Sequence, residues 1–211
     1  PLGMYAGLYP KSPISKIIMT GSVIGFSVPN FWQGLMLIML FAVFWRILPA
    51  GGRDDTVDVL FVPVSFLTWD GLTHMFLPAL NLAIFKISLV IRLSRAGTAE
   101  VGLQDYVKYA RARGLSERRV INVHILKNIL IPVVTVVGLE LGNVIAFAVV
   151  TETVFAWPGI GKLLIDSIGL LDRPVVVAYL MLTVFMFVMI NLVVDIIYSL
   201  LDPRIRVKRG G

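Results

Sequence analysis

Long apolar runs alternate with short polar segments along this chain. Residues 17–45 contain no charged side chain, and three further runs, at about 75–95, 129–150 and 174–200, contain only a few. A helix needs roughly 20 apolar residues to cross the hydrocarbon core of a bilayer, so each run is long enough to span a membrane. The pattern therefore predicts an all-α fold, a polytopic bundle of transmembrane helices that forms one domain over residues 1–211.

The first run contains a helix breaker, and the segment that follows it is polar. Pro29 lies inside the run and lacks the backbone N–H that a continuous helix needs, so we expect a break there. Residues 49–73 carry Gly51, Gly52 and several aspartates around an apolar patch at 60–67. We expect this segment to be a loop on the membrane surface, and an element that contacts the substrate is the alternative.

Two charged residues interrupt the apolar runs. A charge at the bilayer centre costs about 2.5–3.5 kcal/mol on insertion scales, so Lys86 and Glu140 each need a partner or water. We expect Lys86 to have a structural partner or to extend its ammonium group toward the interface, with a pore-lining role as the alternative. Gly138 and Gly142 flank Glu140 and form a small-xxx-small pair, which favours close packing against another helix.

Composition and charge narrow the class of protein. The 211 residues are 57% hydrophobic and 15% charged, which is too apolar for an ordinary soluble domain, and no cysteine is present to form disulfides or thiolate metal sites. Fourteen of the 19 Lys and Arg residues flank one side of the predicted spans. The other side has only four of them, Arg46, Arg53, Lys162 and Arg173. The positive-inside rule therefore predicts that segment 105–132 and the C-terminus are cytoplasmic.

The net charge of +6 does not indicate a nucleic-acid partner. Many of the bases lie between Arg92 and Lys127, in a segment tied at both ends to predicted spans. Basic groups placed there contact anionic membrane lipid, at about 1 kcal/mol each. We therefore predict membrane lipid, and no nucleic acid, as the partner of this charge.

Segment 105–132 reads as two helices joined at a glycine. Asp105 to Arg113 has an acid at its start and bases toward its end, the favourable sense for a helix dipole. Gly114 stands where a left-handed C-cap is wanted, and Leu115 is the apolar partner of such a cap. Ser116 is then expected to cap a second helix that continues into the next span. We call residues 105–132 the knob, because two short helices with a fixed hinge form a rigid projection.

Two further segments have recognisable patterns. Residues 152–161 read ETVFAWPGIG, in which Trp157 suits the membrane interface while Pro158 and Gly159 predict a turn before a short helix. The C-terminal segment has its own pattern of Asp195, Tyr198, Asp202, Pro203, Arg204, Ile205 and Arg206. We expect that segment to end the last helix and anchor it among lipid headgroups.

These three stretches together resemble the permease subunits of bacterial ABC importers. The knob is similar to their cytoplasmic EAA coupling loop, and residues 106–116 follow the version of the dipeptide, oligopeptide and nickel branch, Tyr-x-x-x-Ala-Arg-Ala-x-Gly-Leu-Ser. Lys108 and Tyr109 stand where the general motif has Glu and Ala, and the proline comes later, at Pro132. The resemblance covers essentially the whole chain, and implies a type I importer permease that here lacks an N-terminal part with its first span.

The resemblance implies a set of partners and a coupling role for the knob. The partners are a second homologous permease subunit, two ATP-binding subunits that carry the ATP and Mg, and a periplasmic or extracellular solute-binding protein. We expect coupling to the ATPase through a loop at 96–128. Ala110 would fit closely into the ATPase groove, Gly114 would set the angle, and Ser116 would hold the second helix. The coupling residues are Tyr109, Ala110, Arg113, Gly114, Leu115 and Ser116, with solvated charge as the alternative role of the arginines.

The segment at 152–161 is the second candidate site. In the resembled family it is extracytoplasmic, and it is expected either to plug the pore or to dock the binding protein. A turn anchored by aromatic residues is the alternative. Its candidate residues are Glu152, Phe155, Trp157, Pro158 and Gly159.

Enzyme chemistry has little support in the sequence. No GxxxxGK[ST] loop is present, and His74 and His124 do not form a paired metal motif, so we predict no catalytic residue, no metal and no cofactor on this chain. An ion-gradient-driven transporter or channel that uses Lys86 and Glu140 is the alternative function, and a membrane hydrolase is a third. The sequence leaves the solute open among dipeptides, longer peptides, glutathione-like molecules, nickel chelates and sugars.

Overall fold

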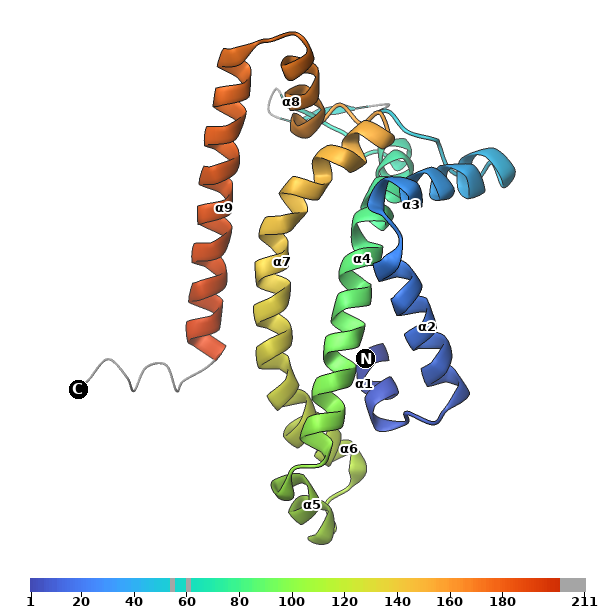
Figure 1. Cartoon of the computed structure of the whole chain (residues 1–211), viewed down its shortest axis with the longest axis vertical. Coiled ribbons are helices and arrows are strands. Elements are labelled where there is room, and N and C mark those ends of the chain that lie inside the picture. The colour runs from blue at the N-terminus through green and yellow to red at the C-terminus, as the bar shows by residue number, and fades with distance from the viewer. Residues whose placement is uncertain (54–55, 60–61, 202–211) are drawn as a thin grey trace, which may run out of the picture. The chain divides into compact units, whose positions relative to one another are not determined.

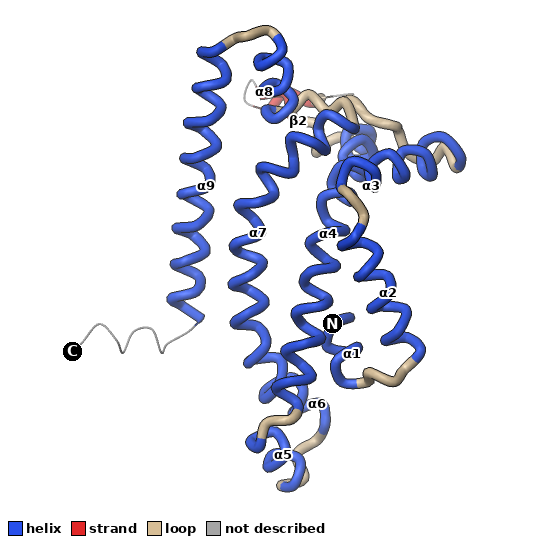
Figure 2. Tube along the Cα trace, viewed as in Figure 1, coloured by secondary structure: helices blue, strands red, loops and turns tan. Residues whose placement is uncertain are grey.

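Helices make up nearly all of the fold. The computed structural model describes residues 1–53, 56–59 and 62–201, and Figure 2 shows that short loops join its helices. The elements in chain order (Figure 1) are α1 (Leu2–Leu8), α2 (Pro13–Ser27), α3 (Asn30–Leu37), the π-helical η1 (Ile38–Phe44), β1 (Val57–Val59), β2 (Val62–Val64), α4 (Trp69–Gly102), α5 (Asp105–Ala112), α6 (Glu117–Arg119), the π-helical η2 (Val120–Ile125), α7 (Leu126–Val154), α8 (Ile160–Gly169) and α9 (Arg173–Leu201).

Several of these helices are long and apolar enough to cross a membrane. Within the described part of the chain, three qualify alone, over Trp69–Gly102, Glu117–Val144 and Arg173–Ile196. Helices α2 and α3 with η1 qualify as a fourth only as a broken pair. The predicted all-α polytopic fold is therefore confirmed. The last three predicted runs each lie inside one helix, and the first is divided over α2, α3 and η1.

The first predicted run is broken where its proline stands. Helix α2 ends at Ser27, and Pro29 takes an extended backbone with φ −59° and ψ 137° before α3 starts at Asn30. A proline disfavours the helical conformation of the residue before it, here Val28, so the break follows directly from the sequence. The break predicted at Pro29 is confirmed.

The segment at 49–73 contains more regular structure than the expected loop. Strands β1 and β2 form an antiparallel hairpin in which Val57 lies opposite Val64, and α4 begins already at Trp69. β-Branched residues favour such pairing. Residues 60–61 of the predicted apolar patch lie outside the described residues, and its place on a membrane surface stays a prediction.

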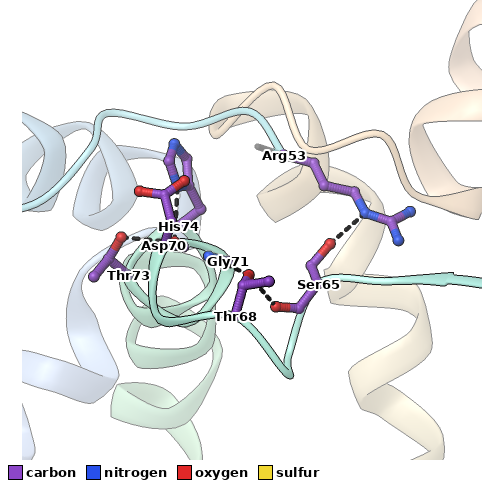
Figure 3. Close-up of polar contacts among 7 residues, drawn as sticks. All are labelled: Arg53, Ser65, Thr68, Asp70, Gly71, Thr73 and His74. Atoms are coloured by element: carbon purple, nitrogen blue, oxygen red, sulfur yellow. Dashed lines mark hydrogen bonds and ion pairs between the residues drawn. The ribbon is translucent and has the colours of Figure 1, made fainter. Parts of the chain in front are cut away.

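A chain of hydrogen bonds fixes the start of α4 (Figure 3). The Thr68 hydroxyl donates to the Ser65 carbonyl at 2.9 Å and accepts the Gly71 N–H at 3.0 Å, which caps the helix. The Arg53 Nε donates to the Ser65 hydroxyl at 2.5 Å. The Arg53–Ser65 bond joins residues on both sides of the hairpin, and the Thr68 bonds join Ser65 to the first turn of α4. Together they tie the hairpin to the helix and explain why α4 starts earlier than the apolar pattern predicts.

The chain divides into two compact units, each assembled from separate stretches. The first comprises residues 1–27, 86–141 and 189–211, and the second residues 28–85 and 142–188. In the first unit, α1 packs closely on α4 because Gly3 and Gly7 lack side chains. A Cβ on Gly7 would lie 2.7 Å from the Cβ of Thr98. A single-domain organisation therefore stays a prediction.

An ion pair crosses between two helices of the first unit. The Lys86 ammonium on α4 bonds to Oε2 of Glu140 on α7, and the two side chains are 18% and 22% exposed. Each charge thereby has a partner within an apolar stretch, as the cost of an isolated charge requires. This confirms the structural partner predicted for Lys86 and the need for a partner predicted for Glu140.

The glycines beside that pair permit close helix packing, as predicted. A Cβ on Gly138 would collide with the side chain of Val194, which belongs to the first unit as well. Within the second unit, a Cβ on Gly142 would collide with the ring of Phe187. The small-xxx-small pair therefore brings the α7 backbone against side chains of α9 in each unit separately.

Candidate functional site

The hinge of the knob is a complete Schellman motif. Helix α5 starts with Asp105 in its first turn and ends at Ala112, with Arg111 in its last turn. Gly114 follows with φ +76°. Its N–H donates to the Arg111 carbonyl at 2.9 Å, and the Leu115 N–H donates to the Ala110 carbonyl at 3.3 Å. These two bonds satisfy the last carbonyls of the helix, and the left-handed glycine predicted from the sequence is confirmed.

Leu115 and Ser116 differ in how they hold the second helix. Leu115 packs on the buried cluster of the knob, as the apolar partner of the cap should. Ser116 occupies the N-cap of α6, but its hydroxyl makes no capping hydrogen bond. Only its carbonyl takes part, accepting the Arg119 N–H at 2.9 Å. The predicted side-chain cap is therefore wrong, and packing rather than a hydroxyl orients this helix.

The buried cluster gives Ala110 a role inside the chain. Ala110 is 4% exposed and packs with Val107 on its own helix and with Val120 on η2. Ile125 and Ile129 complete the cluster. We expected the small side chain of Ala110 to enter a partner's groove, but the structure buries it between α5 and η2. A small residue is needed here because the two helical segments approach each other at this point.

The outer face of the knob combines aromatic and basic side chains. Tyr106 is 44% and Tyr109 63% exposed, and Leu103, just before α5, is 72% exposed. Tyr106 and Tyr109 are three positions apart on α5, so they lie along the same side of that helix. The Arg113 guanidinium lies 5.6 Å from the centre of the Tyr109 ring. We define Leu103, Tyr106, Tyr109 and Arg113 as the knob face.

Sequence reasoning found only part of this face. Tyr109 and Arg113 were predicted, whereas Leu103 and Tyr106 were missed, although the spacing of three residues between Tyr106 and Tyr109 was a usable signal. Arg111 is engaged within the chain, since its Nε lies 2.7 Å from Oε1 of Glu117. Both groups of that pair are well exposed, so it contributes little stability, about 0–1 kcal/mol.

The second candidate site, at residues 152–161, is built around the Glu152 carboxylate. Its Oε2 accepts the Lys162 N–H at 2.8 Å, at the first turn of α8. A carboxylate at a helix N-terminus is favourable because the exposed N–H groups carry partial positive charge. Gly159 and Gly161 permit this approach, since a Cβ on Gly159 would overlap the carboxylate. The predicted turn before a short helix is confirmed.

The two aromatic residues of this turn, Phe155 and Trp157, differ in how deeply they are buried. Phe155 is 1% exposed, and its carbonyl accepts the Gly52 N–H at 2.9 Å, so it belongs to the core of the second unit. Trp157 is half-buried, and its backbone N–H donates to the backbone carbonyl of Glu152 at 2.8 Å. Pro158 is exposed. The turn therefore presents Trp157 and Pro158, while Phe155 anchors it from inside.

A pocket of about 210 Å³ adjoins this turn within the second unit. Helix α4 contributes Met75, Pro78 and Leu82, and Glu152 and Trp157 line it as well. Thr151 also lines the pocket, and it is 2% exposed.

Thr151 belongs to a buried polar network that the sequence analysis missed. Its hydroxyl accepts hydrogen bonds from Asn30 and Asn81, both at 3.2 Å, and Gln33 donates to the Asn81 side-chain oxygen at 3.1 Å. Asn81 is fully buried. These bonds link α3, α4 and α7, so they hold the helices that form the wall of the pocket.

The side chains with metal or catalytic potential are dispersed. The described residues contain no group of three or more His, Cys, Asp or Glu side chains able to hold a metal. His74 bonds locally, with its Nδ1 3.0 Å from the Asp70 carbonyl oxygen. Of the C-terminal pattern, Asp195 and Tyr198 lie on α9, and residues 202–206 lie outside the described residues.

Comparison with known proteins places this geometry in context. Residues 1–207 match the family described as binding-protein-dependent transport system inner membrane component. The chain is 38% identical over 224 residues to the dipeptide transport system permease protein DppB of Escherichia coli (strain K12), covering 99% of this chain and 66% of that protein.

Two further relatives have similar names. The di/tripeptide transport system permease protein DppB of Pseudomonas aeruginosa (strain UCBPP-PA14) is 43% identical over 219 residues, covering 98% of this chain and 65% of that protein. The oligopeptide transport system permease protein AppB of Bacillus subtilis (strain 168) is 39% identical over 205 residues, covering 97% and 63%. The chain therefore spans about two thirds of the length of these relatives.

Proposed function

The chain belongs to the family of binding-protein-dependent transport system inner membrane components, and from this premise we propose that it is a membrane-spanning permease subunit of an ATP-driven ABC importer. The names of these relatives support peptides, or similar small solutes, as the cargo. The observation that carries the proposal is the knob, a capped and internally packed projection between the ends of α4 and α7 with an exposed aromatic face.

The packing of the knob suits the transmission of force. Val107 and Val120 are fully buried against each other's helices, and the cluster continues to Ile129 on α7. Close-packed interiors deform little, so a partner that displaces α5 moves the adjoining part of α7 with it. In the proposed cycle, ATP closes two partner ATPase subunits, the knob follows them, and the attached spans switch between inward-open and outward-open states.

The remaining parts of the importer lie on other chains in this proposal. A second homologous permease completes the pathway, ATP and Mg bind the ATPase subunits, and a periplasmic or extracellular solute-binding protein delivers the cargo. This chain itself is not an enzyme. It lies in a bacterial or archaeal cytoplasmic membrane with lipid around it, and its knob and C-terminus face the cytoplasm, as the distribution of Lys and Arg indicates.

A substitution at the hinge tests the proposal. Gly114→Val places a β-branched residue at φ +76°, a conformation that such a residue resists. The expected result is loss of the ATPase subunits on purification of the tagged permease, and loss of ATP-driven dipeptide uptake in proteoliposomes, with the permease still inserted in the membrane.

The matched control is Gly102→Val, at the end of α4. No atom lies within 4 Å of a Cβ built there, and the backbone is not left-handed. We expect this variant to retain its ATPase subunits. Normal uptake by Gly114→Val would contradict the proposal, and ATP-independent uptake driven by an imposed ion gradient would favour the alternative transporter.

A further inference from the structure

The pocket beside Trp157 is the right size for one amino-acid residue. Its volume of about 210 Å³ is below the roughly 300–1,000 Å³ of pockets for drug-sized ligands. It is nevertheless larger than an engineered cavity of about 150 Å³ that holds benzene. Apolar side chains, including Met75, Pro78 and Leu82, form one wall. Such a space accepts a single side chain with its backbone rather than an entire large solute.

The charge at the edge of this mostly apolar pocket favours a cation. Glu152 is the one charged side chain among the described residues that line the pocket. Its Oε2 accepts one N–H, from Lys162, while the ammonium group of Lys162 bonds to Asp166 at 2.7 Å. A carboxylate has about four acceptor positions, so one backbone donor leaves capacity for a further partner.

Trp157 adds a second attraction for the same kind of group. It lines the pocket together with Glu152 and is joined to it by the backbone bond of the turn. Indole is the aromatic ring that attracts cations best, and the attraction grows when water is excluded. A carboxylate and an indole beside an apolar wall therefore match an ammonium group that carries an apolar substituent.

We propose that this pocket binds the amino-terminal residue of a peptide, with its ammonium group at Glu152 and Trp157 and its side chain against Met75, Pro78 and Leu82. This inference rests on the proposed function and adds to it a recognition site on the permease itself. The network around Thr151 keeps the wall in place for this purpose. Cargo with a free amino terminus is thereby distinguished from blocked peptides.

The test measures binding without the solute-binding protein, which has its own specificity. The permease complex with its ATPase subunits is placed in nanodiscs, and equilibrium dialysis follows radiolabelled Ala-Phe and N-acetyl-Ala-Phe. Glu152→Gln removes the charge but keeps an oxygen to accept the Lys162 N–H. Because hydrogen bonds to charged groups are worth about 1.5–3 kcal/mol, we expect at least a ~10-fold loss of Ala-Phe affinity. The original protein should bind N-acetyl-Ala-Phe about as weakly as the Glu152→Gln variant binds Ala-Phe.

The control variant is Asp172→Asn, which removes a carboxylate of the second unit that does not line the pocket. It should bind Ala-Phe as the original protein does. Equal binding by Glu152→Gln, equal binding of the blocked peptide, or no Ala-Phe binding by an assembled complex would each overturn the pocket proposal and leave the proposed function intact. Failure of any ATPase subunit to assemble with the permease would overturn the proposed function itself.

Discussion

At the scale of single residues, Lys86 and Glu140 stabilise the fold as a pair. Lys86 and Glu140 are mostly buried and bond to each other. Removal of one member of such a pair leaves the other uncompensated, whereas removal of both is often nearly neutral. Their pairing therefore serves the architecture of the first unit and does not favour the gradient-driven transporter.

The prediction at this scale concerns Lys86→Met. This variant should lose about 3–5 kcal/mol of stability, because the mostly buried Glu140 carboxylate loses its bond to the Lys86 ammonium group. The double variant Lys86→Met with Glu140→Leu should recover most of that loss. The measurement is the thermal unfolding midpoint of the detergent-purified subunit, and equal midpoints for the single and double variants would contradict the structural role.

The sequence predicts the structural role of some residues and not of others. Gly114 and Leu115 were predictable because a helix end needs a left-handed residue and an apolar partner within a few positions of it. The network at Thr151 was not predictable, since Asn30 and Thr151 are 121 residues apart in sequence. Ala110 was found but misinterpreted, because its spacing shows that a small residue is needed and does not show which helix it contacts.

At the scale of elements, different residues of helix α5 pack inside the knob and remain exposed for a partner. Ala110 is buried between α5 and η2, whereas Tyr109 on the same helix is 63% exposed. One residue therefore sets the shape of the projection and the other is available to a partner. Helix boundaries were predictable here from acids, bases and glycine, but at α4 the early start depends on Thr68 and Ser65, whose hydrogen bonds the apolar pattern does not reveal.

Two substitutions on α5 should therefore fail in different ways. Ala110→Leu overfills the cluster and should cost about 1–3 kcal/mol of stability, together with loss of ATPase binding. Tyr109→Ala should leave the unfolding midpoint of the isolated subunit unchanged yet weaken ATPase binding, as truncation of an exposed aromatic contact does. Thermal unfolding and co-purification together check both results, and a destabilised Tyr109→Ala variant would argue against the docking role.

At the scale of the whole molecule, the distribution of charge predicts membrane topology. The knob and the C-terminus are expected in the cytoplasm, and the turn at 152–161 outside it. Each described helix that is long and apolar enough to cross a membrane contains an apolar run predicted from the sequence. The sequence therefore correctly predicted a protein with several membrane-spanning helices. It did not predict the division into two compact units, because that division depends on contacts between distant segments.

The absence of cysteine in the sequence makes this topology directly testable. Leu103→Cys on the knob face and Leu170→Cys after α8 place single thiols at well exposed positions. A membrane-impermeant maleimide applied from outside should label Leu170→Cys and leave Leu103→Cys unmodified until the membrane is opened. Labelling of both from outside, with the membrane intact, would contradict the orientation.

The π-helical segment η2 has a consequence for changes in chain length. A π-helix closes its hydrogen bonds over one residue more than an α-helix does, so η2 holds an extra residue between α6 and α7. A one-residue deletion at Val123, an exposed position, can be absorbed there by a return to α-helical geometry. The same deletion inside α7 would rotate all later side chains by about 100°. Length variants of this protein should therefore be tolerated at η2 and excluded from the span that follows it.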